Sequence, residues 1–294
     1  MKTITHKSSL DESVNFYTPI EGKPGAAFEA RYVRRNQDKV SVYLSSFGGC
    51  NLACRMCHLT ANGLTDMTPA TIEDYKDQFD QVFQHYRSQV PVVGQAVKFE
   101  INFMARGDAL LNDALLNDHH KLFAYIEGKA RLQPMKTEVT FNISTIFPKD
   151  IRKTEVLEML LDPKVELFYS LYSLDSEFRK RWLPKAMHPD DVKDEFLLEL
   201  RDDCKDFTIH YCLIKGENDR GQTRDIAHWL DDDWIDARLN IVRFNPPNDK
   251  YEEPDESHIQ AIFDNARDYF TTNSRIVDRV GTDVAAACGM FLKD

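Results

Sequence analysis

The sequence lacks any long apolar run. No stretch of its 294 residues approaches the roughly 20 consecutive apolar residues that a membrane-spanning helix requires. The first residues, "MKTITHKSSLDES", also lack the apolar core of a signal peptide. We therefore expect a cytoplasmic protein without membrane contact. The composition is that of a globular protein, 42% hydrophobic and 29% charged, long enough for one large domain or two small ones.

The sequence also lacks an excess of positive charge. Its formal net charge of -11 opposes nonspecific attraction to a polyanion. A nucleic-acid substrate therefore requires a local basic patch, although a run of charges is also typical of ordinary solvated surface. Two runs are candidates: "RYVRRNQDK", with Arg31, Arg34, Arg35 and Lys39, and "FRKRWLPK", with Arg179, Lys180, Arg181 and Lys185.

Cysteines are few, and half of the six lie together. In a reducing compartment such clustered thiols are more typical of metal binding or redox chemistry than of a disulfide framework. Cys50, Cys54 and Cys57 form C-x3-C-x2-C within "SSFGGCNLACRMCHLT". Structural zinc usually takes two C-x2-C pairs, and no second pair exists, whereas three thiolates on a cluster of four irons leave one iron open to bind a small molecule. Chance clustering of buried thiols, or a zinc site completed by His58, remain alternatives.

Hydrophobic periodicity alternates between short strand-like runs and helical ones, which predicts an α/β fold with a parallel sheet. We expect a partial (β/α)6 TIM-like barrel with short N-terminal and C-terminal extensions. Residues 1–28 are predicted to form an irregular extension, and residues 29–294 the core domain. The expected strands are 39–46, 96–103, 137–144, 165–172, 206–214 and 237–244, with a further strand at 274–280. The expected helices include 68–88, with Thr68 as N-cap and Pro69 in the first turn, 151–161, 190–202, 222–231 and 256–270.

The cysteine motif resembles the signature of radical S-adenosylmethionine (SAM) enzymes, because it follows the first strand of a predicted partial barrel. "SSFGGCNLACRMC" is similar to "SSQxGCxxxCxFC" of the RlmN/Cfr family, whose members methylate adenines in RNA. The resemblance runs from about residue 29 to residue 292. Six more stretches resemble the family in order: "FMARGDALLN", "NISTIF", "YSLYSLDSEFRKRWLP", "YCLIKGENDR", "NIVRFNPP" and "VGTDVAAACGMF".

The resemblance implies two cofactors, a [4Fe-4S] cluster and SAM. It places the cluster on Cys50, Cys54 and Cys57, with SAM on the open iron, where the reduced cluster cleaves it to a deoxyadenosyl radical. It also implies an electron donor such as flavodoxin or ferredoxin. A single Ser or Asn at the end of a strand usually caps the backbone there or is simply a satisfied polar group. Several such residues at the ends of neighbouring predicted strands favour cofactor binding instead. The positions matching SAM contacts in the family are Gly107, Asp108, Ser144, Ser170, Leu171, Tyr172 and Asn245, with Asp108 in place of Glu and Tyr172 in place of His.

Cys288, in "AAACGMF", matches the cysteine that the family methylates with one SAM. The radical from a second SAM abstracts hydrogen from that methyl group, and the resulting methylene radical adds to the adenine ring. A carrier thiol is needed because an sp2 ring carbon is too poor a nucleophile for polar transfer. The small residues around it, Ala285 to Ala287 and Gly289, predict a flexible segment that reaches into the barrel mouth. The alternative is a small buried C-terminal thiol.

The sequence departs from the family at several positions. Tyr43 stands where the family has a cysteine that helps to remove the ring proton and releases the adduct as a disulfide. Tyrosine cannot form that disulfide, and unperturbed tyrosine, with a pKa of about 10, is a poor base. Cys212 is a substitute if it faces the barrel interior, the alternative being a buried structural thiol. Glu29 resembles the family's proposed proton acceptor, the alternative being an exposed loop glutamate. Phe47 replaces a glutamine, and only about 28 residues stand where the family has an N-terminal accessory domain.

Three functional hypotheses follow. The leading one is a radical SAM enzyme that methylates an adenine in RNA through Cys288, with the RNA held by local basic patches. The alternative keeps the cluster and the radical but changes the substrate or the reaction, because Tyr43 replaces the releasing cysteine. The third is a binding protein that retains the fold without the catalysis.

Overall fold

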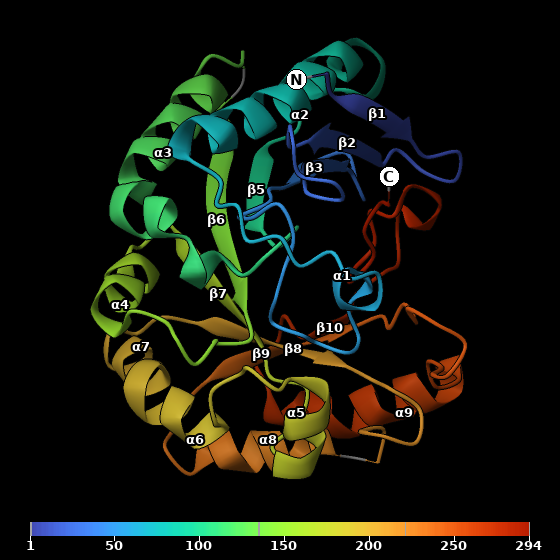
Figure 1. The fold of residues 1–294 in the computed structure, drawn as a ribbon. Coiled ribbons are helices and arrows are strands. Elements are labelled where there is room, and N and C mark those ends of the chain that lie inside the picture. Colours follow the sequence, from blue (N-terminus) through green and yellow to red (C-terminus); the bar gives the residue numbers. More distant parts are fainter. Residues whose placement is uncertain (1, 135, 221, 294) are drawn as a thin grey trace.

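The structure is a computed structural model that describes residues 2–134, 136–220 and 222–293. Within these residues, ten strands form one sheet in chain order (Figure 1). From β4 onwards all neighbours are parallel, as the alternation of strands and helices predicts. The partial barrel is therefore confirmed. Its strands are β4 (Lys39–Tyr43), β5 (Lys98–Phe103), β6 (Glu138–Thr145), β7 (Val165–Ser170), β8 (Phe207–Cys212), β9 (Ala237–Val242) and the short β10 (Arg275–Ile276).

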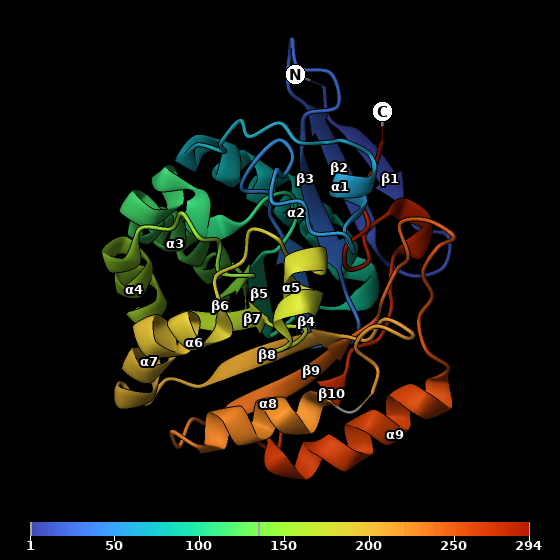
Figure 2. The ribbon, with the colours of Figure 1, turned by 60° about the horizontal axis from the view of Figure 1, so that its bottom comes forward.

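Helices wrap the outer face of this curved sheet (Figures 1 and 2). Residues 189–202, close to the predicted helix 190–202, form one helical stretch in which a π-helical turn joins two short helices. Single 3₁₀ turns lie at Ala109–Leu111, Arg267–Tyr269 and Thr282–Val284. The helices are α1 (His58–Ala61), α2 (Ile72–Val93), α3 (Asp113–Arg131), α4 (Lys153–Leu161), α5 (Ser176–Trp182), α6 (Pro189–Val192), α7 (Leu198–Asp202), α8 (Gln222–Asp231) and α9 (Glu256–Ala266).

Helix α2 begins one turn later than predicted. Thr71, rather than Thr68, is its N-cap: the Thr71 hydroxyl accepts a 3.2 Å hydrogen bond from the Asp74 amide, and the Asp74 carboxylate accepts one of 2.8 Å from the Thr71 amide. This reciprocal pair satisfies two amides that the first turn leaves without partners. Thr68 instead bonds to Asp66, and Pro69 pairs with Phe47 in a β-bridge. The predicted start of the helix is therefore wrong.

The N-terminal residues are not irregular, so that expectation is also wrong. β1 (Ile4–Lys7), β2 (Val14–Pro19) and β3 (Ala27–Val33) form an antiparallel extension of the sheet, and β3 pairs with β4. All seven residues of β3 are buried, which removes the alternation that reveals a half-exposed strand. The predicted boundary at residue 28 falls inside β3, and a division into two units stays a prediction.

Two hydrophobic clusters support the cavity described below. The larger one fills the space between the sheet and the surrounding helices. The smaller one lies against the cysteine loop and includes Trp182, which is fully buried. Within the described ranges, no helix is long and apolar enough to cross a bilayer.

Candidate active site

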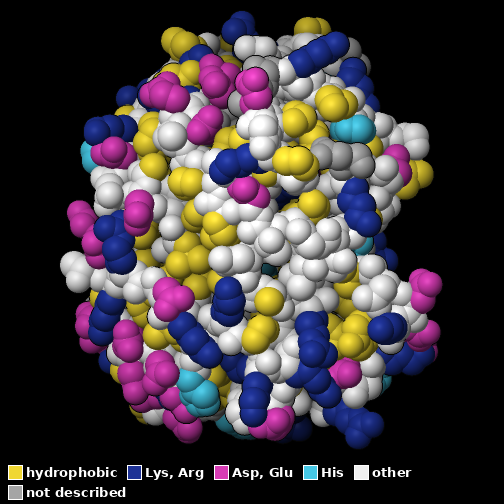
Figure 3. All heavy atoms as spheres, in the orientation of Figure 1, with side chains coloured by type: hydrophobic (Ala, Val, Ile, Leu, Met, Phe, Trp, Pro, Cys, Tyr) yellow, Lys and Arg dark blue, Asp and Glu magenta, His cyan; other side chains and the backbone are white. Residues whose placement is uncertain are grey.

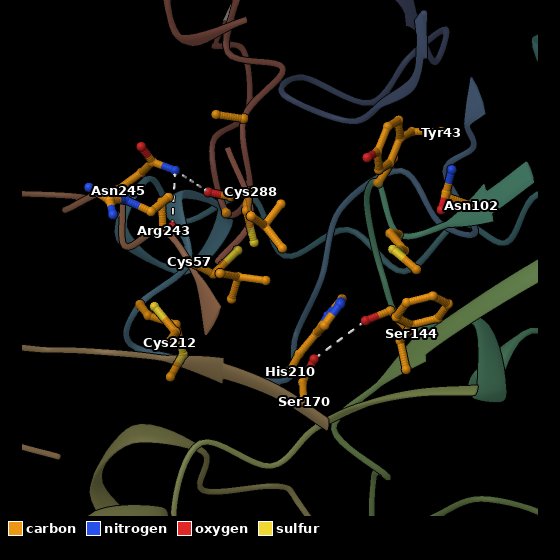
Figure 4. Close-up of a pocket in the computed structure, with 18 of the residues that line it drawn as sticks. Tyr43, Cys57, Asn102, Ser144, Ser170, His210, Cys212, Arg243, Asn245 and Cys288 are labelled. Atoms are coloured by element: carbon orange, nitrogen blue, oxygen red, sulfur yellow. Dashed lines mark hydrogen bonds between the residues drawn. The ribbon is translucent and has the colours of Figure 1, made fainter. Parts of the chain in front are cut away.

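A cavity opens at the carboxyl ends of the parallel strands, where βα barrels place their catalytic groups (Figure 4). Of the predicted site residues, Leu171 does not line it, because its side chain is fully buried in the larger hydrophobic cluster. Glu29 is not among the lining residues either. The predicted residues that do line it are Tyr43, Cys50, Cys54, Cys57, Gly107, Asp108, Ser144, Ser170, Tyr172, Asn245 and Cys288, together with Cys212.

The cysteine loop joins β4 to α1 in a tight conformation. Ala53 has a left-handed backbone with φ of 59°, which is uncommon for a residue with a side chain and is typical of functional sites. A Cβ atom at Gly49 would lie 2.5 Å from the carbonyl oxygen of Leu64, so only glycine fits there. The loop therefore packs directly on the chain that follows α1, and its thiols face the cavity.

The three thiols of the loop lie in one low-dielectric environment. Burial raises the pKa of Cys50 to about 11 and that of Cys57 to about 12, and it raises the pKa of Cys54 well above its usual value. The neighbouring thiols raise the pKa of Cys54 and Cys57 further. Without a bound cation these groups are protonated, so a ligand with positive charge is needed to bring them to thiolates.

The cysteines fit a cluster better than a single ion. Within the described residues, no three His, Cys, Asp or Glu side chains converge as ligands of one metal ion. In a cluster of four irons each thiolate binds a different iron, so the sulfurs stand further apart than around one ion. The imidazole Nε2 of His58 lies 3.2 Å from the Asn245 carbonyl oxygen. The structure therefore gives no support to the zinc alternative.

Asp108 lies in the turn after β5, at the start of the 3₁₀ turn Ala109–Leu111, and lines the cavity with the cysteines. Its carboxylate accepts hydrogen bonds from the Thr145 hydroxyl at 2.9 Å and from the Leu110 and Ile146 amides at 3.1 and 3.2 Å. Burial nevertheless raises its pKa to about 6, because these donors do not offset the loss of water. A cationic ligand such as an ammonium group in the cavity would stabilise the ionised carboxylate.

Gly107 precedes Asp108 in a left-handed conformation with φ of 81°. A Cβ atom there would lie 2.5 Å from Cδ2 of Phe47. Phe47, which replaces the family's glutamine, is 5% exposed and packs directly on this turn. The Gly-Asp pair is therefore held in place by an apolar ring.

The remaining predicted SAM positions lie at the ends of β6, β7 and β9 or just after them. The hydroxyls of Ser144 and Ser170 lie 3.4 Å apart on neighbouring strands (Figure 4). Tyr172 has a left-handed backbone with φ of 59°, and burial, followed by the nearby Cys288 and Cys212, raises the pKa of its phenol well above its usual value. Asn245 donates a 2.8 Å hydrogen bond to the Cys288 carbonyl.

Cys288 lies in the C-terminal tail and reaches the cavity. Its side chain is open to the cavity. The surrounding protein atoms nevertheless displace much of the water around the thiol, and this desolvation raises its pKa. Its thiol interacts electrostatically with those of Cys57 and Cys212. Hydrogen bonds hold the backbone on both sides of Cys288, and the expectation of a flexible segment stays a prediction. The alternative of a thiol enclosed in the core is wrong.

Cys212 and Tyr43 occupy different parts of the cavity. Cys212, at the end of β8, is 5% exposed and faces the interior, so the condition for its use is met. It lies on the same side of the cavity as Cys288 and Cys57, whereas Tyr43 lies on the opposite side in the view of Figure 4. A hydrogen bond joins the Tyr43 phenol to Arg35.

Glu29 lies within β3 and is fully buried, so the alternative of an exposed loop glutamate is wrong. Its carboxylate forms ion pairs of 2.8 Å with Arg106 and 3.1 Å with Arg31. The role of proton acceptor stays untested.

The first predicted basic run does not form a surface patch. Arg31 is buried, Arg34 donates to backbone carbonyls, and Lys39 pairs with Glu100 at 3.0 Å. The fourth basic residue of this run, Arg35, lines the cavity.

The second basic run is partly exposed. Arg179 is buried against backbone carbonyls and Arg181 pairs with Glu217, while Lys180 and Lys185 are exposed. Lys185 interacts electrostatically with Cys50. In the view of Figure 3, which has the orientation of Figure 1, Lys and Arg side chains gather on the lower half of the molecule, around α5.

Sequence reasoning missed a polar layer deeper in the barrel. It consists of inward-facing side chains on β5, β6, β8 and β9, and burial lowers the pKa of His210 to about 3, so that this imidazole is neutral. Each of these residues lies two positions from another cavity-lining residue of the same strand. This alternation was the signal in the sequence that could have revealed the layer. The residues are Glu100, Asn102, Asn142, His210 and Asn240.

No protein-family model matches the chain. Three curated proteins called dual-specificity RNA methyltransferase RlmN are similar to it. The protein of Bdellovibrio bacteriovorus is 28% identical over 300 residues, which are 98% of this chain and 67% of that protein. The proteins of Marinomonas sp. and Sulfurovum sp. are 27% and 26% identical, over 87% and 99% of this chain and 67% and 80% of their own lengths.

Among solved structures, a radical SAM methyltransferase from Sphaerobacter thermophilus superposes with a TM-score of 0.79 at 16% identity, over 98% of this chain and 80% of that one. This likeness supports the fold. Fold, cavity and relatives together define an enzyme of the radical SAM methyltransferase type. Within that class, the similarity to these relatives supports an RlmN/Cfr-like family.

Proposed function

We propose that this protein methylates an adenine in RNA, using a [4Fe-4S] cluster, SAM and Cys288 as methyl carrier. The observation that carries the proposal is that Cys288 shares one cavity with the three clustered cysteines, although it lies 231 positions after Cys57 in the sequence. A cytoplasmic location and an electron donor such as flavodoxin or ferredoxin belong to the same proposal.

Cys50, Cys54 and Cys57 would hold the cluster. Asp108 would bind the ammonium group of SAM, with Ser144, Ser170, Tyr172 and Asn245 around it. When bound, the cluster and SAM supply a deoxyadenosyl radical. The protein residues orient SAM beside Cys288, and the surrounding side chains keep bulk water from the reacting atoms.

Cys288 carries the methyl group between SAM and the base. Its thiol accepts a methyl group and, after loss of one hydrogen atom, presents a methylene radical to an adenine carbon. An sp2 carbon of this kind accepts a radical more readily than it attacks a sulfonium methyl group. Addition leaves an unpaired electron on the ring. Loss of that electron, which the oxidised cluster would accept, and of the ring proton, which would pass to water, leaves a thioether that joins Cys288 to the base and has to be broken.

Cys212 breaks that thioether, in place of the cysteine that Tyr43 replaces. The Cys212 thiol loses its proton and attacks the Cys288 sulfur. An S–S bond forms, the S–CH2 bond breaks, and its electron pair passes to the methylene carbon, which takes up a proton and becomes the methyl group. A thiol reductant then supplies two electrons to reopen the disulfide. Cys212 suits this role because it lines the same side of the cavity as Cys288, whereas Tyr43 lies on the opposite side in the view of Figure 4.

The RNA approaches over the basic side chains around the mouth. Lys180, Lys185 and Arg55 are exposed, with Lys180 and Arg55 lining a second hollow beside α5, and Arg35 lines the cavity itself. Arg55 stands between two of the cluster cysteines. These cations would contact phosphates and orient the strand, since phosphate contacts fix position more than sequence.

The test is anaerobic incubation of the reconstituted enzyme with reductant, SAM and total RNA, followed by mass spectrometry of the nucleosides. Methyladenosine should form with the wild-type chain and should be absent with Cys288→Ala. The second hypothesis, a different substrate or reaction, is favoured by Tyr43 alone. Deoxyadenosine without methyladenosine, at equal rates in wild type and Cys288→Ala, would support it.

A further inference from the structure

Three charged side chains form a buried network beside the C-terminal tail. Glu29 and Arg31 lie on β3, and Arg106 lies in the turn after β5. Glu29 and Arg106 are fully buried, and Arg31 is 2% exposed. Burying charges is costly unless each is paired and hydrogen-bonded, so the contacts of such a network identify what it holds.

The carboxylate of Glu29 has no free lone pair. It accepts four hydrogen bonds, from Arg106 Nε at 2.8 Å, the Leu292 amide at 3.1 Å, Arg31 Nη2 at 3.1 Å and Asn15 Nδ2 at 2.8 Å. A carboxylate offers about four lone-pair sites, so these donors fill it. Glu29 is also absent from the cavity lining, and the geometry gives it no access to a substrate proton.

The guanidinium of Arg106 spans from the cysteine loop to the tail. Its Nη1 donates at 3.0 Å to the carbonyls of Gly25 and Gly48, and Gly48 lies two residues before Cys50. Its Nη2 donates at 2.9 Å to the Leu292 carbonyl. One rigid, planar group therefore sets the distance between the cluster ligands and the end of the chain.

The guanidinium of Arg31 holds the backbone on both sides of Cys288. It donates at 3.4 Å to the Ala287 carbonyl and at 2.7 Å to the Met290 carbonyl. From the opposite side, the His58 amide donates at 2.9 Å to the Gly289 carbonyl. With the contact from Asn245, each carbonyl from residue 287 to residue 290 has a donor.

We propose that Glu29, Arg31 and Arg106 are positioning residues that fix the Cys288 segment against the cysteine loop, and that Glu29 serves this role rather than that of proton acceptor. The inference rests on the proposed function, because a methyl carrier has to meet SAM and the substrate carbon at defined distances. A misplacement of about 1 Å can cost about a hundredfold in rate. The network supplies that placement without touching the reacting atoms.

The first test measures the tail itself, by hydrogen exchange on the full chain without cofactors. Arg106→Met removes the donors to Gly48 and Leu292. Amide exchange in the segment 286–293 should rise at least tenfold. Arg34→Met is the matched control, because Arg34 donates to the carbonyls of Val93 and Gly94, away from the tail. Unchanged exchange in folded Arg106→Met would overturn the proposal.

A second variant keeps the test sharp if Arg106→Met does not fold. A chain that ends at Phe291 retains all three charged residues and loses the anchor at Leu292 together with the two residues after it. It should show the same increase in exchange over residues 286–291. Normal exchange there would show that Arg106 and Glu29 do not hold the tail.

Glu29→Gln separates positioning from proton transfer. If the carboxylate positions the tail, this variant raises tail exchange, and deoxyadenosine formed per methyl group transferred to Cys288 increases severalfold. If it accepts the ring proton, exchange and Cys288 methylation stay at wild-type values and only RNA methylation fails, which would overturn the proposal. Absence of Cys288 methylation in the wild type would instead refute the proposed function, and with it the need for this placement.

Discussion

The side-chain amide of Asn245 donates a 2.8 Å hydrogen bond to the backbone carbonyl of Cys288 (Figure 4). This contact joins a predicted SAM position to the predicted methyl carrier. Asn245→Ala should lower the rate of Cys288 methylation at saturating SAM by about fivefold, because a hydrogen bond of this kind contributes about 1 kcal/mol. Asn248→Ala, an exposed change in the same loop, is the control. An unaltered rate at saturating SAM would mean that the contact does not position Cys288.

Loss of Cys212 should stop the reaction at the covalent intermediate. In Cys212→Ala the thioether between Cys288 and the base forms but is not broken, so no methylated RNA should be released and about one RNA per enzyme should stay covalently attached. Cys204→Ala is the matched control, because Cys204 is exposed and outside the cavity lining. Tyr43→Cys should not raise the turnover of the wild-type chain. Sustained turnover in Cys212→Ala would refute the role of this thiol.

Substitution of Gly107 should destabilise the turn before Asp108 in two ways. Gly107→Ala places a side chain in a left-handed backbone, which costs about 1–2 kcal/mol, and also forces it against Phe47. Gly216→Ala separates the two effects, because Gly216 has φ of 75° but a Cβ atom added there would meet nothing within 4 Å. Urea unfolding should show a clearly larger loss of stability for Gly107→Ala. Equal losses would mean that Phe47 yields without cost.

His210 should make the fold sensitive to acid. Burial lowers its pKa to about 3, whereas an unfolded histidine has a pKa of about 6.5. Below the latter value the unfolded chain binds a proton that the folded chain does not, so stability falls as pH falls. Between about pH 6.5 and pH 5 the loss is about 2 kcal/mol.

His210→Gln should remove this part of the pH dependence, as measured by chemical unfolding at several pH values. His120→Gln, on the exposed side of α3, should follow the wild-type profile. The same slope in His210→Gln and wild type would show that another group accounts for the acid sensitivity.

The barrel strands could be predicted because their buried runs are bounded by helical patterns. On this basis the predicted bounds of β8 and β9 agree with the structure to within a few residues. β2 and β3 could not be predicted, because residues that are buried on both faces show no period of two. The predicted start of helix α2 is one turn early because Thr68 followed by Pro69 imitates a helix start, while the Thr71–Asp74 pair forms it.

The site was predictable where a local motif carries it. The spacing of Cys50, Cys54 and Cys57 reveals a shared ligand, and Cys288 was found through its resemblance to a known segment. The contact between Glu29 and Arg106 joins residues 77 positions apart, and no periodicity links them. Such contacts are set by how the sheet and the tail pack, so only the folded chain reveals them.

The most direct test of the central claim is a map of cysteine masses. The reconstituted enzyme is given reductant and SAM without RNA under anaerobic conditions, and its peptides are analysed by mass spectrometry. We predict one added methyl group on Cys288, none on Cys204 or Cys212, and none on any cysteine in a Cys54→Ala variant. Deoxyadenosine formation with Cys288 unmodified would contradict the account.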